Sequence, residues 1–380
     1  MLEERGVKIG IEVEEEPTKE SEVFYNTDMV LNRDVSVSAL KVYREDQNVD
    51  LEVLDALSAT GIRGLRYHND IDGLKVTMND SKPEAVENIE ENIDLNGFDT
   101  EDLEVTGKDA NLLMTERRKG YHFIDLDPFG SPARFMDSAA RSLKHDSFLG
   151  VTATDLASLC GTYTKTCRRR YGAWTENVSF CHEVGLRVLI RHIFESLARF
   201  NKVFRPKLSF AQRHYYRVFG TVRESKKGVN RNLEKVGFLM VCEECGNRDM
   251  VQERTEIFQE CPDCGEEVRR LGPLWIGKLG RKDFVSRVRQ DLEEKELEEA
   301  AELTRMLEEE VLIRKPYFDT HNLGNITGLP VPRRKELLER IRDKGYNAVR
   351  THFTPTGIRT SCPAEDLRKM VREMHEESEE

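Results

Sequence analysis

The feature that most constrains this 380-residue chain is an alternation of short apolar runs with helix-like segments through its first half. Strands that alternate with helices form a parallel sheet with helical crossovers. The sequence therefore predicts a doubly wound α/β domain over residues 1–235. A later run, 207–223, alternates aromatic with charged residues and predicts long strands near the sheet edge. The apolar runs span residues 51–57, 74–80, 103–106, 121–127 and 148–154, and the helical patterns span 62–69, 81–97 and 111–118.

The helix between the second and third of these runs has well-marked ends. Ser81 is a typical N-cap, Pro83 suits the first turn, and Glu84 completes a capping box. Gly97 follows the last apolar position and is expected to end the helix.

Acidic residues stand where four successive strands are expected to end: Asp55, Asp80, Asp109 and Asp127. A doubly wound sheet binds its ligand at the carboxyl ends of the strands, although a single aspartate there is also a common turn residue. The loop after Asp55 contains Gly61 but lacks G-x-G-x-x-G, which favours a nucleoside over a dinucleotide. Asp80 is suited to ribose hydroxyls, and Asp109 with Ala110 to an adenine amine. Together these positions predict a class I S-adenosylmethionine-dependent methyltransferase core.

The fourth strand ends in Asp127-Pro-Phe129, a turn that resembles the motif of enzymes methylating exocyclic amines of nucleobases. The lone pair of such an amine is delocalised into the ring. A carboxylate that accepts its N–H bonds localises the lone pair and later takes up the proton. Asp127 is therefore the expected acid/base and Phe129 the stacking platform for the base. The alternative is a strand-terminating turn with Phe129 in the core.

Four cysteines predict a structural zinc site. Two C-x2-C pairs are separated by fifteen residues, and a glycine follows each pair. Four thiolates suit a tetrahedral Zn²⁺ with no open position for catalysis. Disulfides are the alternative, which a reducing compartment disfavours. The remaining four cysteines are scattered in the sequence and are expected to be ordinary thiols. The cluster Cys242, Cys245, Cys261 and Cys264 defines a zinc module over residues 236–278.

Charge is distributed unevenly along the chain. The formal net charge is −12, which taken alone argues against a nucleic-acid ligand. Residues 160–235, however, carry seventeen Lys or Arg against five Glu and no Asp. This segment predicts a basic face for RNA, unless positive and negative side chains interleave on folding. Its basic and aromatic residues include Lys165, Arg168, Arg169, Arg170, Tyr171, Trp174, Arg213, His214, Tyr215, Tyr216 and Arg217.

Composition excludes a membrane protein. Charged residues make up 34% of the chain, and the mean hydropathy is −0.59. The glutamate-rich beginning of the sequence is unlike a secretory signal, so a cytoplasmic location is expected. No obligate protein partner is evident.

The last third of the chain predicts a smaller α+β domain over residues 279–380. Residues 279–311 form one long helical pattern with an acidic face, and 333–344 predict a basic helix. The acidic tail, 375–380, is expected to be disordered.

Four segments, 24–26, 32–34, 54–64 and 125–132, closely resemble the tRNA (guanine(26)-N2)-dimethyltransferase family. The four-cysteine cluster and residues 351–359 fit its archaeal members, and the resemblance covers about residues 10–370. It implies two successive methyl transfers from S-adenosylmethionine to one guanine N2 of tRNA. It also implies that the domain 279–380 helps to bind the tRNA.

The resemblance also implies roles for single residues. Arg33, together with Arg63 or Arg66, would lie near the methionine carboxylate of the cofactor. Phe24 and Phe129 would sandwich the target guanine. The other implied positions are Asp127 as catalyst, Asp80 on the ribose, and Asp109 with Ala110 beside the adenine.

Two other functions remain open from the sequence. One is methylation of another RNA guanine or nucleobase amine; Asp-Pro-Phe in place of Asn-Pro-Pro-Tyr disfavours DNA as the substrate. The other is a zinc-containing RNA-binding protein whose nucleoside pocket is vestigial.

Overall fold

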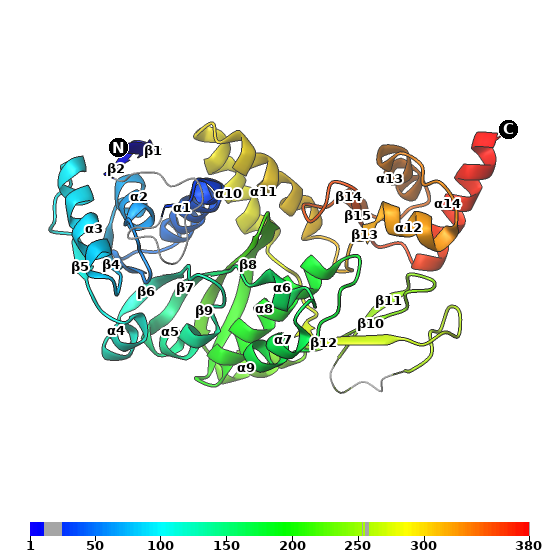
Figure 1. The fold of residues 1–380 in the computed structure, drawn as a ribbon, viewed down its shortest axis with the longest axis horizontal. Helices are drawn as coiled ribbons and strands as arrows, with labels where there is room; N and C mark the ends of the chain where they lie inside the picture. The colour runs from blue at the N-terminus through cyan, green and yellow to red at the C-terminus, as the bar shows by residue number, and fades with distance from the viewer. Residues whose placement is uncertain (11–24, 253, 255–257, 380) are drawn as a thin grey trace.

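The computed structural model describes residues 1–10, 25–252, 254 and 258–379. At its centre is a seven-stranded sheet in the order β5-β4-β3-β6-β7-β9-β8 (Figure 1). The first five strands are parallel, and β9 runs antiparallel to both β7 and β8. The doubly wound sheet and its long edge strands are confirmed. The strands are β3 (Leu51–Asp55), β4 (Leu74–Asn79), β5 (Leu103–Thr106), β6 (Tyr121–Leu126), β7 (Leu143–Ala153), β8 (Lys202–Gln212) and β9 (Tyr215–Glu224).

The order of the strands creates a switch point beside β3. The chain runs outward from β3 to β4 and β5, then returns to β6 on the other side of β3. The loops that leave β3 and β6 therefore diverge, and a crevice opens at the carboxyl ends of these strands.

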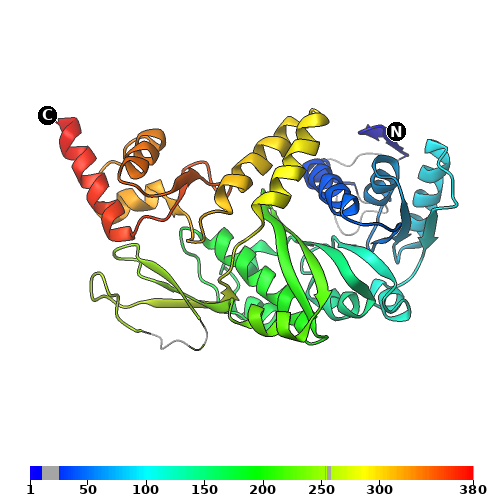
Figure 2. The ribbon, with the colours of Figure 1, turned by 180° about the vertical axis from the view of Figure 1, so that it is seen from behind.

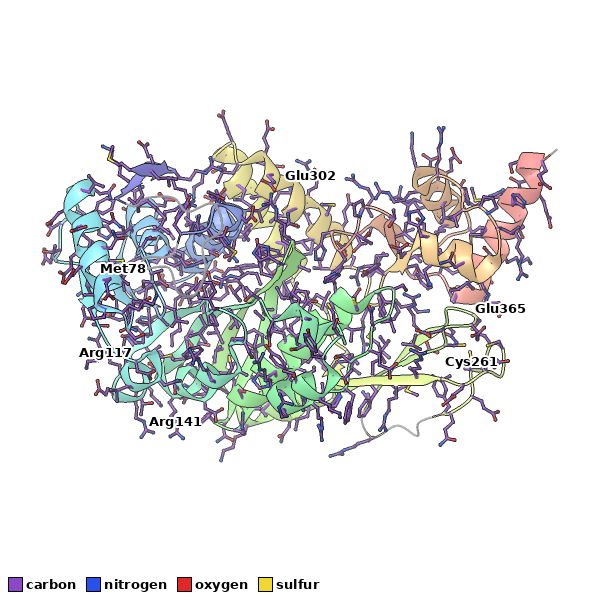
Figure 3. The ribbon with its side chains drawn as sticks, viewed as in Figure 1. Met78, Arg117, Arg141, Cys261, Glu302 and Glu365 are labelled. Atoms are coloured by element: carbon purple, nitrogen blue, oxygen red, sulfur yellow. The ribbon has the colours of Figure 1, made fainter. Side chains whose placement is uncertain are left out.

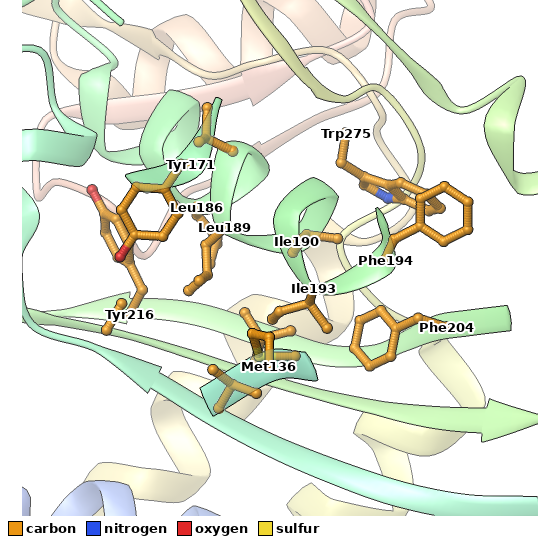
Figure 4. Packing of buried hydrophobic residues seen from close by; sticks show 14 of the residues in the cluster. Met136, Tyr171, Leu186, Leu189, Ile190, Ile193, Phe194, Phe204, Tyr216 and Trp275 are labelled. Atoms are coloured by element: carbon orange, nitrogen blue, oxygen red, sulfur yellow. The ribbon is translucent and has the colours of Figure 1, made fainter. Parts of the chain in front are cut away.

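Helices cover both faces of the sheet, because successive strand residues point to opposite sides. Val53 and Phe123 face one apolar core, and their neighbours Leu54 and Ile124 face the other. Figure 1 shows the helices on the two sides of the sheet. One core includes α1 (Val30–Glu45), α2 (Ile62–Asp70), α3 (Pro83–Asn96), α10 (Lys282–Glu294) and α11 (Glu298–Glu310). The other includes α4 (Ala110–Glu116), α5 (Met136–Ser142) and α8 (Cys181–Ala198), and Figure 4 shows part of it.

The expected capping box of α3 does not form. Lys82 is the N-cap residue, and its side chain makes no capping hydrogen bond. Asp80 Oδ1 accepts the Lys82 backbone N–H at 3.0 Å, so the acid after the strand makes the bond to the N-cap N–H that a capping box assigns to its glutamate. Gly97 ends the helix with φ +64°, as expected.

The long helix expected over 279–311 is two helices that pack on the catalytic sheet. The chain reverses at Glu296, where φ is +57°. Phe284 of α10 lies 5.7 Å from Phe148 of β7, ring centre to ring centre, and Asp291 accepts a hydrogen bond from Ser38 of α1 at 2.6 Å. α10 and α11 therefore pack in the same core as α1 and the sheet. The domain boundary expected at residue 279 would cut through this core.

Two smaller units lie at the end of the molecule away from the N-terminus (Figures 1 and 2). One is a three-stranded sheet in the order β11-β10-β12 that carries the paired cysteines. Its Trp275 packs against Phe194 of α8, with ring centres 5.8 Å apart (Figure 4). The strands are β10 (Val236–Val241), β11 (Arg248–Gln252) and β12 (Arg269–Trp275).

The other unit has a core of its own, built from the last sheet and helices of the chain. The tail expected to be disordered is helical to residue 379, because Leu367, Met370 and Val371 of α14 are buried in that core. Its elements are β13 (Phe318–Asp319), α12 (Thr320–Thr327), α13 (Arg334–Asp343), β14 (Ala348–Arg350), β15 (Gly357–Thr360) and α14 (Ala364–Glu379). In the described ranges no helix is both long and apolar enough to cross a bilayer.

Short elements complete the chain. They are β1 (Leu2–Glu4), β2 (Val7–Ile9), α6 (Leu156–Leu159), α7 (Thr164–Tyr171) and α9 (Lys226–Leu233), with single 3₁₀ turns at Thr27–Met29 and Ala133–Phe135.

A buried charge network attaches the C-terminal unit to the catalytic domain. The two carboxylate oxygens of Glu183, on α8, accept hydrogen bonds from Arg359 of β15 at 3.0 and 2.8 Å. Arg187 binds the same carboxylate at 2.7 Å, and Arg359 Nε reaches Glu310 of α11 at 3.0 Å. Burial opposes the charged form of Glu183, but the two guanidinium groups outweigh it and lower its pKa. Removal of one member would therefore leave buried charge uncompensated.

We predict that Glu183→Gln destabilises the fold by about 3–5 kcal/mol, because Arg187 and Arg359 lose the carboxylate they share. Urea unfolding of the full chain measures this. Glu339→Gln is the matched control, since Glu339 forms an exposed pair with Lys335 and should change stability by less than about 0.5 kcal/mol. Equal stability of the two variants would contradict the role of the network.

Candidate active site

A cavity of about 1230 Å³ lies at the carboxyl ends of β3, β4, β6 and β7. The loops that follow these strands form its wall, together with the start of α1 and part of α7. The structure thus brings most of the residues singled out in the sequence to one place. Those on the wall are Arg33, Arg63, Asp80, Asp127 and Phe129.

The loop that carries Asp127 and Phe129 is fixed to the end of the neighbouring strand. Gly130 N–H donates to Thr154 Oγ1 at 2.7 Å, and Thr154 N–H donates to Gly130 O at 2.9 Å. Gly130 has φ +77°, a conformation that favours glycine. The Phe129 side chain is 45% exposed and lines the cavity, so it is not part of the core.

Arg63 connects Asp127 to the centre of the domain. Its guanidinium is buried and pairs with Asp127 through Nη2. Nη1 donates to Asn32 Oδ1 at 2.9 Å and Ser36 Oγ at 3.0 Å, both on α1. Burial alone would lower the pKa of Arg63, but Asp127 and Asp125 raise it well above its usual range. Arg63 is therefore a permanent cation on the wall of the cavity.

Behind Arg63 lies a fully buried pair that sequence reasoning missed. Both terminal nitrogens of Arg217 bind the Asp125 carboxylate, at 2.7 and 2.6 Å, and Tyr67 Oη donates to Asp125 at 2.5 Å. Despite burial, Arg217 and Arg63 lower the pKa of Asp125. Arg217 and the neighbouring Tyr215 and Tyr216 are buried. The prediction that they form part of an RNA-binding face is therefore wrong. No local signal separates a buried arginine from an exposed one on an alternating strand.

Asp55 forms part of the same wall. It is buried, and its Oδ2 accepts the Gly64 N–H at 3.2 Å. Burial raises the pKa of Asp55 to about 7, with Arg63 acting against that shift. Burial thus favours the protonated form of Asp55, and Arg63 favours its carboxylate.

Asp80 holds the loop that follows β3. Its Oδ2 accepts the Ala59 N–H at 3.0 Å, while Oδ1 accepts from Lys82. Each carboxylate oxygen has a second lone pair, so Asp80 keeps acceptor capacity toward the cavity. Gly61 has φ +76°, and a Cβ there would lie 3.1 Å from Ile89 Cγ1, which favours glycine twice over. Gly61 therefore packs against α3, while its neighbours Thr60 and Ile62 line the cavity with Asp80.

Asp109 and Ala110 are not among the described residues that line the cavity. Asp109 is exposed and caps α4, where its Oδ1 accepts the Leu112 N–H at 3.1 Å. Ala110 is buried in the core beneath. The polar contact that ties this strand end to its neighbours comes from Asn79, whose Oδ1 accepts from Thr106 Oγ1 at 2.6 Å.

The structure separates the three candidate arginines. Arg63 and Arg33 line the cavity, whereas Arg66 is not among the described lining residues. Arg66 is held by Glu4 at 2.7 Å and Asp34 at 2.8 Å. Glu4 also binds Arg33 at 2.5 Å. Burial works against the charge of Glu4, but these two arginines lower its pKa to about 2. Nothing in the local sequence of the N-terminal hairpin pointed to this residue.

Phe24 lies outside the described residues. Its expected contact with the guanine therefore stays a prediction. The next residue, Tyr25, is on the cavity wall. Its hydroxyl donates to Glu4 Oε2 at 2.8 Å, and its ring lies under the Arg33 guanidinium, 4.9 Å away.

The four paired cysteines converge at the far end of the three-stranded unit, where Figure 3 labels Cys261. Their sulfur atoms all lie within 4.8 Å of one another. Cys242 Sγ is 3.5 Å from Cys264 Sγ, and Cys245 Sγ is 3.5 Å from Cys261 Sγ. The glycine after each pair has positive φ and donates its N–H to the first cysteine. Four free thiols in two such turns fit a tetrahedral Zn²⁺.

Two of the cysteines expected to be scattered also come together. Cys160 and Cys181 meet His182, with their donor atoms within 4.8 Å of one another. Cys160 Sγ lies 3.4 Å from His182 Nδ1 and 3.0 Å from Tyr216 Oη. Cys160 is buried, and Cys181 and His182 are half-buried. The group supplies three possible ligands, one fewer than the four-cysteine cluster.

The sequence model of one family, N2,N2-dimethylguanosine tRNA methyltransferase, matches residues 7–372. The chain is 33% identical to the tRNA (guanine(26)-N(2))-dimethyltransferase of Methanobrevibacter smithii, over 98% of this chain and 96% of that protein. It is 37% identical to the enzyme of that name from Methanopyrus kandleri, over 94% of this chain and 92% of the relative.

Among solved structures, the chain is similar to Trm1 from Pyrococcus horikoshii in complex with S-adenosyl-L-methionine. The TM-score is 0.87 at 35% sequence identity, covering 97% of this chain and 99% of that one. The similarity therefore includes the catalytic sheet, the cysteine-bearing unit and the C-terminal unit.

We predict about one zinc ion per chain, held by the four-cysteine cluster and lost in Cys261→Ser, because three remaining thiolates cannot complete the site. Metal analysis of the purified protein measures the stoichiometry, and thermal unfolding should show a marked loss of stability in this variant. Cys160→Ser is the control and should retain the metal. Zinc lost from Cys160→Ser but kept by Cys261→Ser would place the ion in the second group instead.

Proposed function

The chain belongs to the N2,N2-dimethylguanosine tRNA methyltransferase family, and we propose how its residues perform that reaction. It transfers two methyl groups from S-adenosylmethionine to the exocyclic N2 of guanine 26 in tRNA. The observation that carries the proposal is the placement of Asp127 and Phe129 on the wall of the switch-point cavity, which Asp80 and the loop after β3 also line. The substrate also makes a cytoplasmic location the expected one.

The residues of the cavity suit the cofactor. Asp80 has acceptor capacity for the ribose hydroxyls. Residues 58–60 and 62, from the loop after β3, line the cavity beside it. Arg33 and Arg63 supply positive charge for the methionine carboxylate. Arg66 is not among the described residues that line the cavity, so we assign the contact to Arg33 and Arg63. When bound, the cofactor supplies an electrophilic methyl group on a sulfonium.

Asp127 acts on the guanine amine. The carboxylate accepts N–H bonds of the amine, which localises the nitrogen lone pair, and it takes up the proton that the amine loses on methylation. One side of the Asp127 carboxylate is paired with the Arg63 guanidinium. The amine therefore approaches the carboxylate from the cavity. Orientation of the amine contributes much of the rate, since the methyl donor is intrinsically reactive.

Phe129 provides the surface on which the guanine stacks. The base has to leave the tRNA stack to reach Asp127, which costs a few kcal/mol. Stacking on aromatic side chains returns about 1–3 kcal/mol per base. The exposed ring of Phe129 is placed for this contact, and the family resemblance adds Phe24 on the other face.

The remaining affinity for tRNA comes from exposed arginines beside the cavity. Arg169 and Arg170 of α7 line its rim, and Arg168 and Arg213 are exposed nearby in the fold. Arg170 is oriented by Asp155, whose carboxylate it binds at 2.9 Å. The C-terminal unit and the zinc-binding unit extend this surface along the tRNA, with zinc in a structural role.

We predict that Asp127→Asn lowers the rate of methyl transfer by about 10²–10⁴-fold, because the amide does not take up the proton of the amine. Affinities for tRNA and for S-adenosylmethionine should stay within a few-fold of the wild type. Single-turnover transfer of labelled methyl groups, with separate binding measurements, checks both statements. Asp137→Asn, which alters an exposed acid on α5, is the control and should be fully active.

Two results would count against this mechanism. Unchanged transfer by Asp127→Asn would remove the residue from catalysis. A wild-type chain that binds tRNA but transfers no methyl group would favour an RNA-binding protein with a vestigial pocket.

We also predict that tRNA affinity falls steeply with salt despite the net charge of −12, because exposed arginines cluster beside the cavity. Four or more phosphate contacts give a plot of log affinity against log salt concentration with a slope of about −3 or steeper. Binding titrations at several salt concentrations provide the slope. A nearly flat plot would show that the basic side chains do not form a phosphate-binding face.

A further inference from the structure

A second cavity lies on the other side of α7 from the active-site cavity. Its volume is about 630 Å³, within the range of about 300–1,000 Å³ usual for ligand sites. It opens where the catalytic domain meets β12 of the zinc-binding unit. Its wall includes Trp174, Phe238, Arg168, Arg270, Glu176 and Pro273.

Trp174 is the most unusual residue of this wall. Its indole is 50% exposed, although tryptophan is normally buried for most of its surface. Its backbone is fixed, since Trp174 N–H donates to Gly272 O and Gly272 N–H donates to Trp174 O, both at 2.8 Å. An exposed aromatic ring on a rigid backbone is a preformed stacking surface.

The charges around the cavity favour an anionic polymer. Arg168 and Arg270 are exposed at the rim, and the Arg270 guanidinium lies 4.9 Å above the Phe238 ring. The acid on this wall, Glu176, is bound by Arg269 at 3.0 Å. Two arginines therefore remain beside two aromatic rings, a combination typical of single-stranded RNA recognition.

α7 connects this cavity with the active site. Arg169 and Arg170 line the active-site cavity, whereas Thr164 and Arg168 of the same helix line the second one. A helix with its side chains is about 10–12 Å across, a distance that a few nucleotides can span. The helix is anchored between them, because Tyr171 Oη donates to Asp155 at 2.6 Å and Arg191 donates to Tyr171 O at 2.6 Å.

We propose that the Trp174 cavity binds a second unstacked base of the substrate tRNA, with Arg168 and Arg270 on the flanking phosphates. The inference rests on the proposed function, because the tRNA that places its guanine on Phe129 also crosses the arginines of α7. The second contact fixes the path of the RNA strand on leaving the active site and so helps to select the target guanine.

The chain has only two tryptophans, which makes the contact directly observable. Trp275 is 2% exposed, so quenching of tryptophan emission by unmodified tRNA reports on Trp174. We expect quenching with the wild type and none with Trp174→Phe, whose tRNA affinity should stay near normal.

Trp174→Ala should weaken tRNA binding by about 5- to 150-fold without a change in the rate of methyl transfer at saturating tRNA. Tyr163→Ala is the control, since that ring is 60% exposed but lies outside both cavities, and it should change neither quantity.

Salt dependence separates stacking from phosphate contact. Trp174→Ala should weaken binding equally at every salt concentration, because stacking releases no counterions, whereas Arg168→Gln should make the salt slope shallower by about 1. Absence of quenching together with normal tRNA affinity of Trp174→Ala would overturn the proposal, and would leave the cavity to another ligand such as a peptide. Failure of the proposed function is a different result, namely no methyl transfer by the wild type.

Discussion

The shape of the active-site cavity depends on one buried guanidinium. Arg63 lies between Asp127 at the cavity and Asp125 beneath it, and it also binds Asn32 and Ser36 of α1. Buried charge is tolerated only where it is paired and hydrogen-bonded. Because its partners come from α1 and from the β6 strand and its following loop, Arg63 fixes these elements relative to one another. Asp127 is thereby presented to the cavity in one orientation.

Buried arginine–carboxylate pairs also join parts of the chain that are distant in sequence. Glu183 and Glu310 hold Arg359 of the C-terminal unit against α8 and α11. Glu4 of the N-terminal hairpin holds Arg33 and Arg66, one on the cavity wall and one behind it. These junctions keep the C-terminal unit and the N-terminal hairpin in a fixed relation to the catalytic cavity. A substrate as large as tRNA is then read by a rigid surface.

Much of the catalytic domain could be predicted from the sequence, because strand ends and helix ends carry local signals. Asp80 and Asp127 lie on the cavity wall as the alternation of strands and helices implied. Contacts between residues that lie far apart in the sequence could not be predicted, because local patterns do not show them. The sequence of β9 does not show that Arg217 faces Asp125 across the sheet, and an acidic amphipathic pattern does not show that α10 packs on α1. Asp109 caps α4, and its expected place beside the adenine stays a prediction.

The most direct test of the account is the identity and position of the methylated nucleoside. The purified chain is incubated with labelled S-adenosylmethionine and unmodified tRNA, and the RNA is digested to nucleosides. We expect N2,N2-dimethylguanosine as the final product, formed through the monomethyl nucleoside, and no product from a tRNA in which guanine 26 is replaced by adenine. A methylated guanosine that persists after this replacement, or a product methylated at any atom other than N2, would contradict this expectation.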